Sequence, residues 1–93
     1  MQRITIKHLN FLCVRLNELT NSPKVPYVRT EDGLVAQIGN FHISQAYGGY
    51  CLHRMHNSCG GVITPLSVVH VTARELYIGM SALLRGIEYQ LED

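Results

Sequence analysis

The sequence predicts a single α+β domain in which two helices flank a run of short antiparallel strands. The chain has 93 residues, enough for one domain over residues 1–93. Apolar residues recur every three or four positions near both ends, which indicates helices. Between them, short stretches of alternating character are separated by glycine-containing turns, as in antiparallel strands. We therefore expect a two-layer domain of order α-β-β-β-β-α, with both helices on one face of a sheet of four to five strands.

The first predicted helix runs from about Thr5 to residue 19. Thr5 can accept a hydrogen bond from a free backbone N–H at the helix start. The breaker cluster at residues 20–23, Thr-Asn-Ser-Pro, ends the helix. Cys13 is expected in the core, because an unpaired cysteine packs as a small apolar side chain. The apolar face of this helix comprises Leu9, Leu12, Cys13, Leu16 and Leu19.

Short strands and tight turns follow. Pro26 cannot donate a ladder hydrogen bond, so the strand that contains it is expected at a sheet edge. Glycines at 33 and 39 mark turns. In the third strand, Phe41 and Ile43 are expected to face the core, with His42 on the other face. The expected strands are residues 25–29, 34–38, 41–45, 51–55 and 62–63.

The last helix is predicted from a capping box at residues 72–75. Thr72 caps the first turn and Glu75 reaches back to it. Gly79 lies inside this helix and costs about 1 kcal/mol relative to alanine, which is tolerable where another group packs closely. The expected buried stripe comprises Leu76, Met80, Leu83, Leu84, Ile87 and Leu91.

The overall composition narrows the class of protein. A hydrophobic fraction of 46% and a charged fraction of 16% are typical of a folded globule. The net charge of +1 argues against a general nucleic-acid binder, and such low charge favours a homo-oligomer. No apolar run reaches the roughly 20 residues of a membrane span, and no signal peptide is recognised. We therefore expect a cytoplasmic protein with no membrane partner, and three cysteines without a disulfide framework.

Two thiols and two imidazoles lie close together in the sequence, at Cys51, His53, His56 and Cys59. These are residue types that bind zinc. Their spacing, C-x-H-x2-H-x2-C, differs from that of standard zinc motifs, so we expect no metal and no other cofactor, with these four residues as a weak candidate set. A thiol and His53 would also provide a nucleophile and a base, but no acid nearby in sequence orients the imidazole. We expect a protein that is not an enzyme.

The central strands carry aromatic and cationic side chains that suit a binding role. On an open sheet face such groups stack on a base or hold a phosphate, and tyrosine and arginine also anchor protein interfaces. A third interpretation is that the tyrosines complete the core with their hydroxyls in water. Arg74 is a further candidate binding residue, because a cation near a helix N-terminus is unfavourable with respect to the helix dipole, and such a departure suggests an interaction role. The candidate binding residues are Tyr47, Tyr50, His53, Arg54, Arg74 and Tyr77.

Residues 39–87 contain six short motifs of glycines, aromatic residues and helix formers: GNFHI, AYGGY, LHRM, GGV, RELY and LRGI. In these motifs the chain resembles a group of small phage and prophage accessory proteins. The resemblance implies a phage origin and a protein that acts by binding, with a host or antiviral-defence protein as the partner that it inhibits. The family pattern lacks the full set of Cys51, His56 and Cys59, which argues further against a metal site.

Three functions therefore compete. The first is a protein-binding inhibitor, which needs no small ligand. The second is a protein that sequesters a nucleotide signal, in an oligomer pocket lined by Tyr47, Tyr50, His53 and Arg54. The third is a nucleic-acid-binding module, which the near-neutral charge places last.

Overall fold

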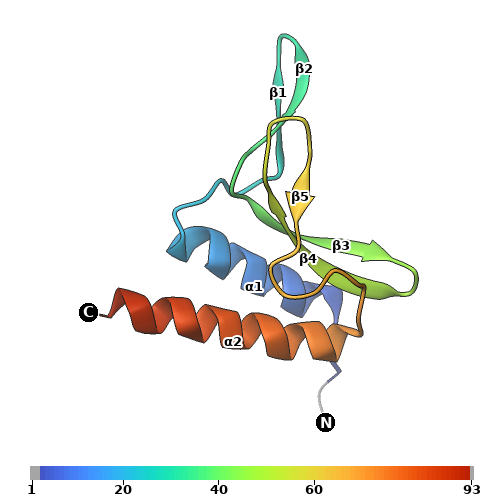
Figure 1. Cartoon of the computed structure of the whole chain (residues 1–93), viewed down its shortest axis with the longest axis vertical. Helices are drawn as coiled ribbons and strands as arrows, with labels where there is room; N and C mark the ends of the chain where they lie inside the picture. Colours follow the sequence, from blue (N-terminus) through green and yellow to red (C-terminus); the bar gives the residue numbers. More distant parts are fainter. Residues whose placement is uncertain (1–2, 93) are drawn as a thin grey trace.

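The computed structural model describes residues 3–92 of the chain (Figure 1). The described residues form two helices and five strands, in the order helix, strands, helix that the sequence predicts, so the α+β class is confirmed. The helices are α1 (Ile6–Leu19) and α2 (Ala73–Leu91), and the strands are β1 (Tyr27–Thr30), β2 (Gly33–Ala36), β3 (Phe41–Ala46), β4 (Gly49–Met55) and β5 (Val62–Ile63). Within the described range, neither helix is long and apolar enough to cross a membrane.

The strands form two separate antiparallel sheets rather than the one sheet expected. β1 and β2 pair as a hairpin, whereas β3, β4 and β5 form a second sheet in that order. The link between β2 and β3 makes its hydrogen bonds elsewhere: the Gly39 N–H donates to the Met55 carbonyl at 2.9 Å, and the Asn40 side chain donates to the Pro23 carbonyl at 2.8 Å. β2 therefore does not pair with β3, and the hairpin projects from the rest of the molecule (Figure 1).

The two helices lie side by side and run in the same direction (Figure 1). Near their N-termini, the rings of His8 and Tyr77 meet edge to face with centroids 6.3 Å apart. Further along, Arg15 and Glu88 form an ion pair at 3.8 Å. Both helices pack against the β3–β4 pair. The buried core comprises Leu9, Leu12, Cys13, Leu16, Phe41, Leu52, Leu76 and Met80, which confirms the expected inward position of Cys13 and Phe41.

Asn17 connects α1 to the sheet through a pair of buried hydrogen bonds that the sequence does not reveal. Its side-chain amide donates to the Phe41 carbonyl at 3.1 Å and accepts from the Phe41 N–H at 2.8 Å. β3 is an edge strand, so this residue satisfies backbone groups that no neighbouring strand pairs. An unpaired buried backbone group costs about 1–3 kcal/mol, and Asn17 removes that cost at this edge.

Candidate binding surface

The two faces of the β3–β4 pair have different neighbours. Residues directly opposite each other in an antiparallel pair project to the same side. Phe41, Ile43 and Leu52 therefore face the helices, and the pairs His42–His53 and Ser44–Cys51 face away from them. Of the predicted binding residues, His53 lies on this outer face, whereas Tyr50 and Arg54 lie on the helix side.

Three histidines gather on the outer face, and we call them the histidine cluster: His42, His53 and His70. The ring centroids of His42 and His53 are 5.5 Å apart, and those of His53 and His70 are 6.4 Å apart. His70 comes from the segment between β5 and α2. Sequence reasoning gave His70 no functional role, because its position next to the others depends on how this segment folds.

Two sets of contacts hold the segment at residues 64–71 against β3 and β4. Tyr50 and Val71 exchange backbone hydrogen bonds of 2.7 and 2.8 Å. The Ser44 hydroxyl lies 3.0 Å from Nε2 of His70, and the Cys51 thiol donates to the Ser67 carbonyl at 3.2 Å. These contacts fix the position of His70.

Two imidazoles of the cluster, those of His42 and His53, are biased towards their neutral forms. Burial, and secondly the neighbouring His53, lower the pKa of His42 below its ordinary value of 6.5. Burial, and secondly His70, lower the pKa of His53 in the same way. A neutral imidazole has one donor and one acceptor nitrogen. At neutral pH these two side chains therefore present hydrogen-bonding groups without added charge.

Tyr47 lies at the turn between β3 and β4 in an unusual backbone conformation. Its φ is 55° and that of Gly48 is 73°, the left-handed pair of a two-residue hairpin turn that favours Asn-Gly. A bulky aromatic residue is uncommon there. The Tyr47 side chain is 97% exposed, and its ring lies edge-on to His70 at 5.7 Å. Val68 and Val69, which precede His70, are also exposed. Together, Tyr47, Val68, Val69 and His70 form what we call the Tyr47 surface.

The other predicted binding residues lie elsewhere. The Arg54 guanidinium stacks over the Phe41 ring at 4.6 Å, and its Nε donates to the Gly39 carbonyl at 3.1 Å. Tyr50 packs against the core. Arg74 is exposed in the first turn of α2, and Tyr77 is half-buried between the helices. A single chain therefore brings Tyr47 and His53 together through His70, but not with Tyr50 or Arg54.

The weak candidate zinc set is not assembled. Cys51 is buried, and burial raises the pKa of its thiol. His56 and Cys59 lie in an exposed loop, where Asn57 Oδ1 accepts from the Cys59 and Gly61 N–H groups at 3.0 and 2.9 Å. These hydrogen bonds are local to the loop. Among residues 3–92, no three His, Cys, Asp or Glu side chains lie close enough to hold a metal ion.

Comparison with protein-family models, with curated proteins and with solved structures found no match for this chain.

Proposed function

We propose that this protein acts by non-enzymatic binding and recognises a protein partner through the Tyr47 surface. The observation that carries the proposal is the conformation of Tyr47. An aromatic side chain is held almost fully in water at a turn position whose backbone favours asparagine. Departures from local preference concentrate at functional sites. Tyrosine is also among the residues that contribute most to protein interfaces.

The neighbours of Tyr47 suit a protein partner. Val68 and Val69, which precede its neighbour His70 in the chain, add exposed apolar surface, and exposed apolar patches mark interaction sites. His70 and His53 supply hydrogen-bonding groups next to that apolar surface. The net charge of +1 gives little electrostatic attraction for a nucleic acid. The proposed partner, following the phage resemblance, is a host or antiviral-defence protein that the chain inhibits.

The substitution Tyr47→Asn separates binding from folding. Asparagine is favoured at this turn position, so the variant should keep the melting temperature of the parent protein or exceed it. It removes the exposed ring and should abolish capture of the partner from host lysate by the immobilised protein. The matched control is Phe11→Gln, which removes another exposed aromatic side chain, on α1, that is 64% exposed.

The outcomes distinguish the competing functions. A partner that the parent protein and Phe11→Gln retain, but that Tyr47→Asn loses, supports the proposal. Equal capture by all three proteins would contradict it. A rise in melting temperature with added nucleotide, lost in Tyr47→Asn, would instead indicate capture of a nucleotide signal.

A further inference from the structure

The apolar stripe of α2 extends beyond the part of the molecule that covers it. Leu76 and Met80 are buried in the core. Leu83 and Ile87 are only partly buried, and Leu91, at the end of the stripe, is 59% exposed. We call Ala73–Met80 the covered half of α2 and residues 82–91 the open half.

The two glycines of α2 locate the end of this cover. A Cβ atom at Gly79 would lie 3.3 Å from Leu66 Cδ1, a side chain of the segment before α2. A Cβ atom at Gly86 would meet nothing within 4 Å. On this side of the helix, cover by the segment before α2 therefore ends between these two positions.

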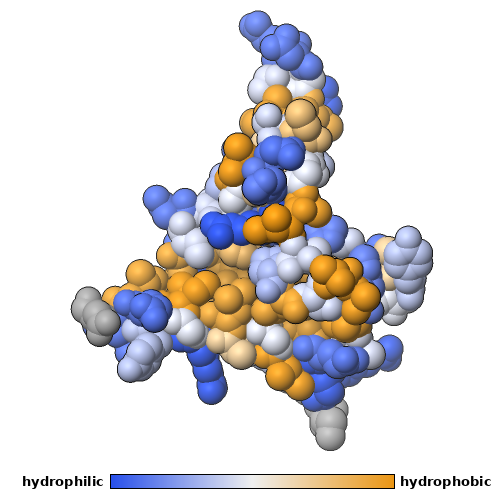
Figure 2. Space-filling view, in the orientation of Figure 1, coloured by the Kyte–Doolittle hydropathy of each residue, from blue (hydrophilic) through white to orange (hydrophobic). Residues whose placement is uncertain are grey.

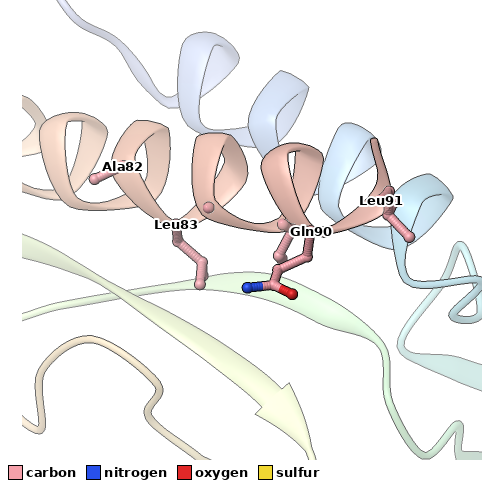
Figure 3. A pocket seen from close by; sticks show the side chains of 6 residues that line it. Ala82, Leu83, Gln90 and Leu91 are labelled. Carbon is pink, nitrogen blue, oxygen red and sulfur yellow. The ribbon is translucent and has the colours of Figure 1, made fainter. Parts of the chain in front are cut away.

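The open half lines a groove of about 440 Å³ along α2. Leu83 and Gln90 project from the same side of the helix (Figure 3). The space-filling view shows apolar surface spread over the helix layer (Figure 2). None of the residues that line the groove is charged. They are Ala82, Leu83, Gly86, Ile87, Gln90 and Leu91.

The chain exposes more surface than a protein of its size normally does. Its accessible surface is 6443 Å², whereas a folded monomer of 10.5 kDa has about 5,400 Å². The excess of about 1,000 Å² is comparable with the roughly 800 Å² that each partner buries in a standard interface. The excess is that of the whole chain, in which the β1–β2 hairpin projects from the rest of the molecule (Figure 1) and Leu91, at the end of α2, is 59% exposed. Among the described residues, sixteen large apolar side chains are exposed, and Leu91 is the one of them that lines the groove.

We propose that a second copy of this chain covers the groove, with the open halves of the two α2 helices packed across a two-fold axis near Gly86. The groove suits an identical surface, because the space over Gly86 is open and Leu91 is exposed beside it. At a two-fold axis each Gly86 faces its own counterpart, so the two helix backbones can approach closely there, and the apolar side chains of each copy pack on either side. Burial of uncharged surface also leaves no ion unpaired.

The substitution Gly86→Glu tests this arrangement without a clash inside the chain. The space around Gly86 is open, and glutamate is a better helix former than glycine. The variant should keep the circular dichroism of the parent protein. In sedimentation equilibrium at tens of micromolar, the parent should have twice the chain mass and Gly86→Glu the chain mass. Asn10→Glu, which adds the same charge at an exposed position of α1, should remain a dimer.

A second measurement does not require a disrupting variant. In a Cys59→Ser background, a cysteine introduced by Gly86→Cys should be joined to its counterpart by a short bis-maleimide at low protein concentration, whereas one introduced by Asn10→Cys should not. A parent protein that sediments at the chain mass would overturn the proposal. So would a dimer that survives Gly86→Glu and fails to cross-link at position 86. The groove and the Tyr47 surface share no residue, so either proposal can fail without the other.

Discussion

The covered and open halves of α2 carry the same apolar pattern but lie in different surroundings. In the covered half, Leu76 and Met80 pack against α1 and β4 and are buried. In the open half, Leu83, Ile87 and Leu91 continue the same face of the helix, but Leu83 and Ile87 are only partly buried and Leu91 is exposed. The comparison shows that periodicity identifies which side of a helix is apolar, whereas the tertiary structure determines how much of that side is buried.

The largest expected effect comes from removing a side chain in the covered half. Leu76→Ala should lower the free energy of unfolding by about 2–5 kcal/mol, because it leaves a cavity in the core. Leu91→Ala, measured at low concentration where the chains are single, should change it by less than about 0.5 kcal/mol, as at most surface positions. Urea titrations of both variants check the contrast. If Leu76→Ala and Leu91→Ala lowered the free energy of unfolding equally at low concentration, the open half would be covered by the chain itself.

A smaller effect is expected from the two glycines. At low concentration, Gly86→Ala should raise the free energy of unfolding by about 1 kcal/mol, because alanine is the better helix former and its methyl group meets nothing. Gly79→Ala should raise the free energy of unfolding by less, since Leu66 must shift to accommodate the new methyl group. The difference between the two urea midpoints measures how tightly each half is packed. A larger increase in the free energy of unfolding for Gly79→Ala than for Gly86→Ala would contradict the assignment of Gly79 to the covered half and Gly86 to the open half.

The smallest effect is expected on acidification. A lower pH should reduce the stability of the folded chain through the histidines of the sheet, but it should not weaken the association of two copies at the groove. The pKa values of His42 and His53 are lowered in the folded state, mainly by burial. The unfolded chain therefore takes up protons first as the pH falls below about 6.5. The contribution of these two histidines to the free energy of unfolding is therefore fully present above that pH and declines below it. The groups that face these rings are Asn40, His70 and the rings themselves.

This decline can be measured as a fall in the urea midpoint between pH 7.5 and pH 5.5. His53→Gln should make the fall shallower, because one titrating group is removed. The groove has no ionisable side chain in its lining, so the sedimenting mass should remain that of a dimer at pH 6, while the protein is still folded. Dissociation at pH 6 with the fold intact would show that titrating groups contribute to the interface.

Much of the fold follows from local sequence patterns. The apolar spacing and the capping threonines predict α1 and α2, and Thr72 indeed accepts a hydrogen bond from the Glu75 N–H at 3.1 Å. The alternation around Phe41 predicts which face of β3 is inward. The division into two sheets was not predictable in this way. It depends on hydrogen bonds of Gly39 and Asn40 to residues far away in sequence.

The candidate site was only partly predictable for the same reason. Tyr47 and His53 stood out as aromatic residues in a strand region. Neither the link between them through His70 nor the left-handed backbone of Tyr47 has a clear local signal. A tyrosine before glycine between two alternating stretches was the available hint. The contact of Asn17 with Phe41 spans 24 positions and gave no hint at all.

The most direct test of the proposed dimer is amide hydrogen exchange along α2 at two protein concentrations. If a second copy covers the open half, dilution should speed exchange for residues 83–91 and leave residues 76–80 unchanged, because the core of each chain protects the latter. If exchange along the whole helix is independent of concentration, the open half faces water in the single chain, and the proposed interface does not exist.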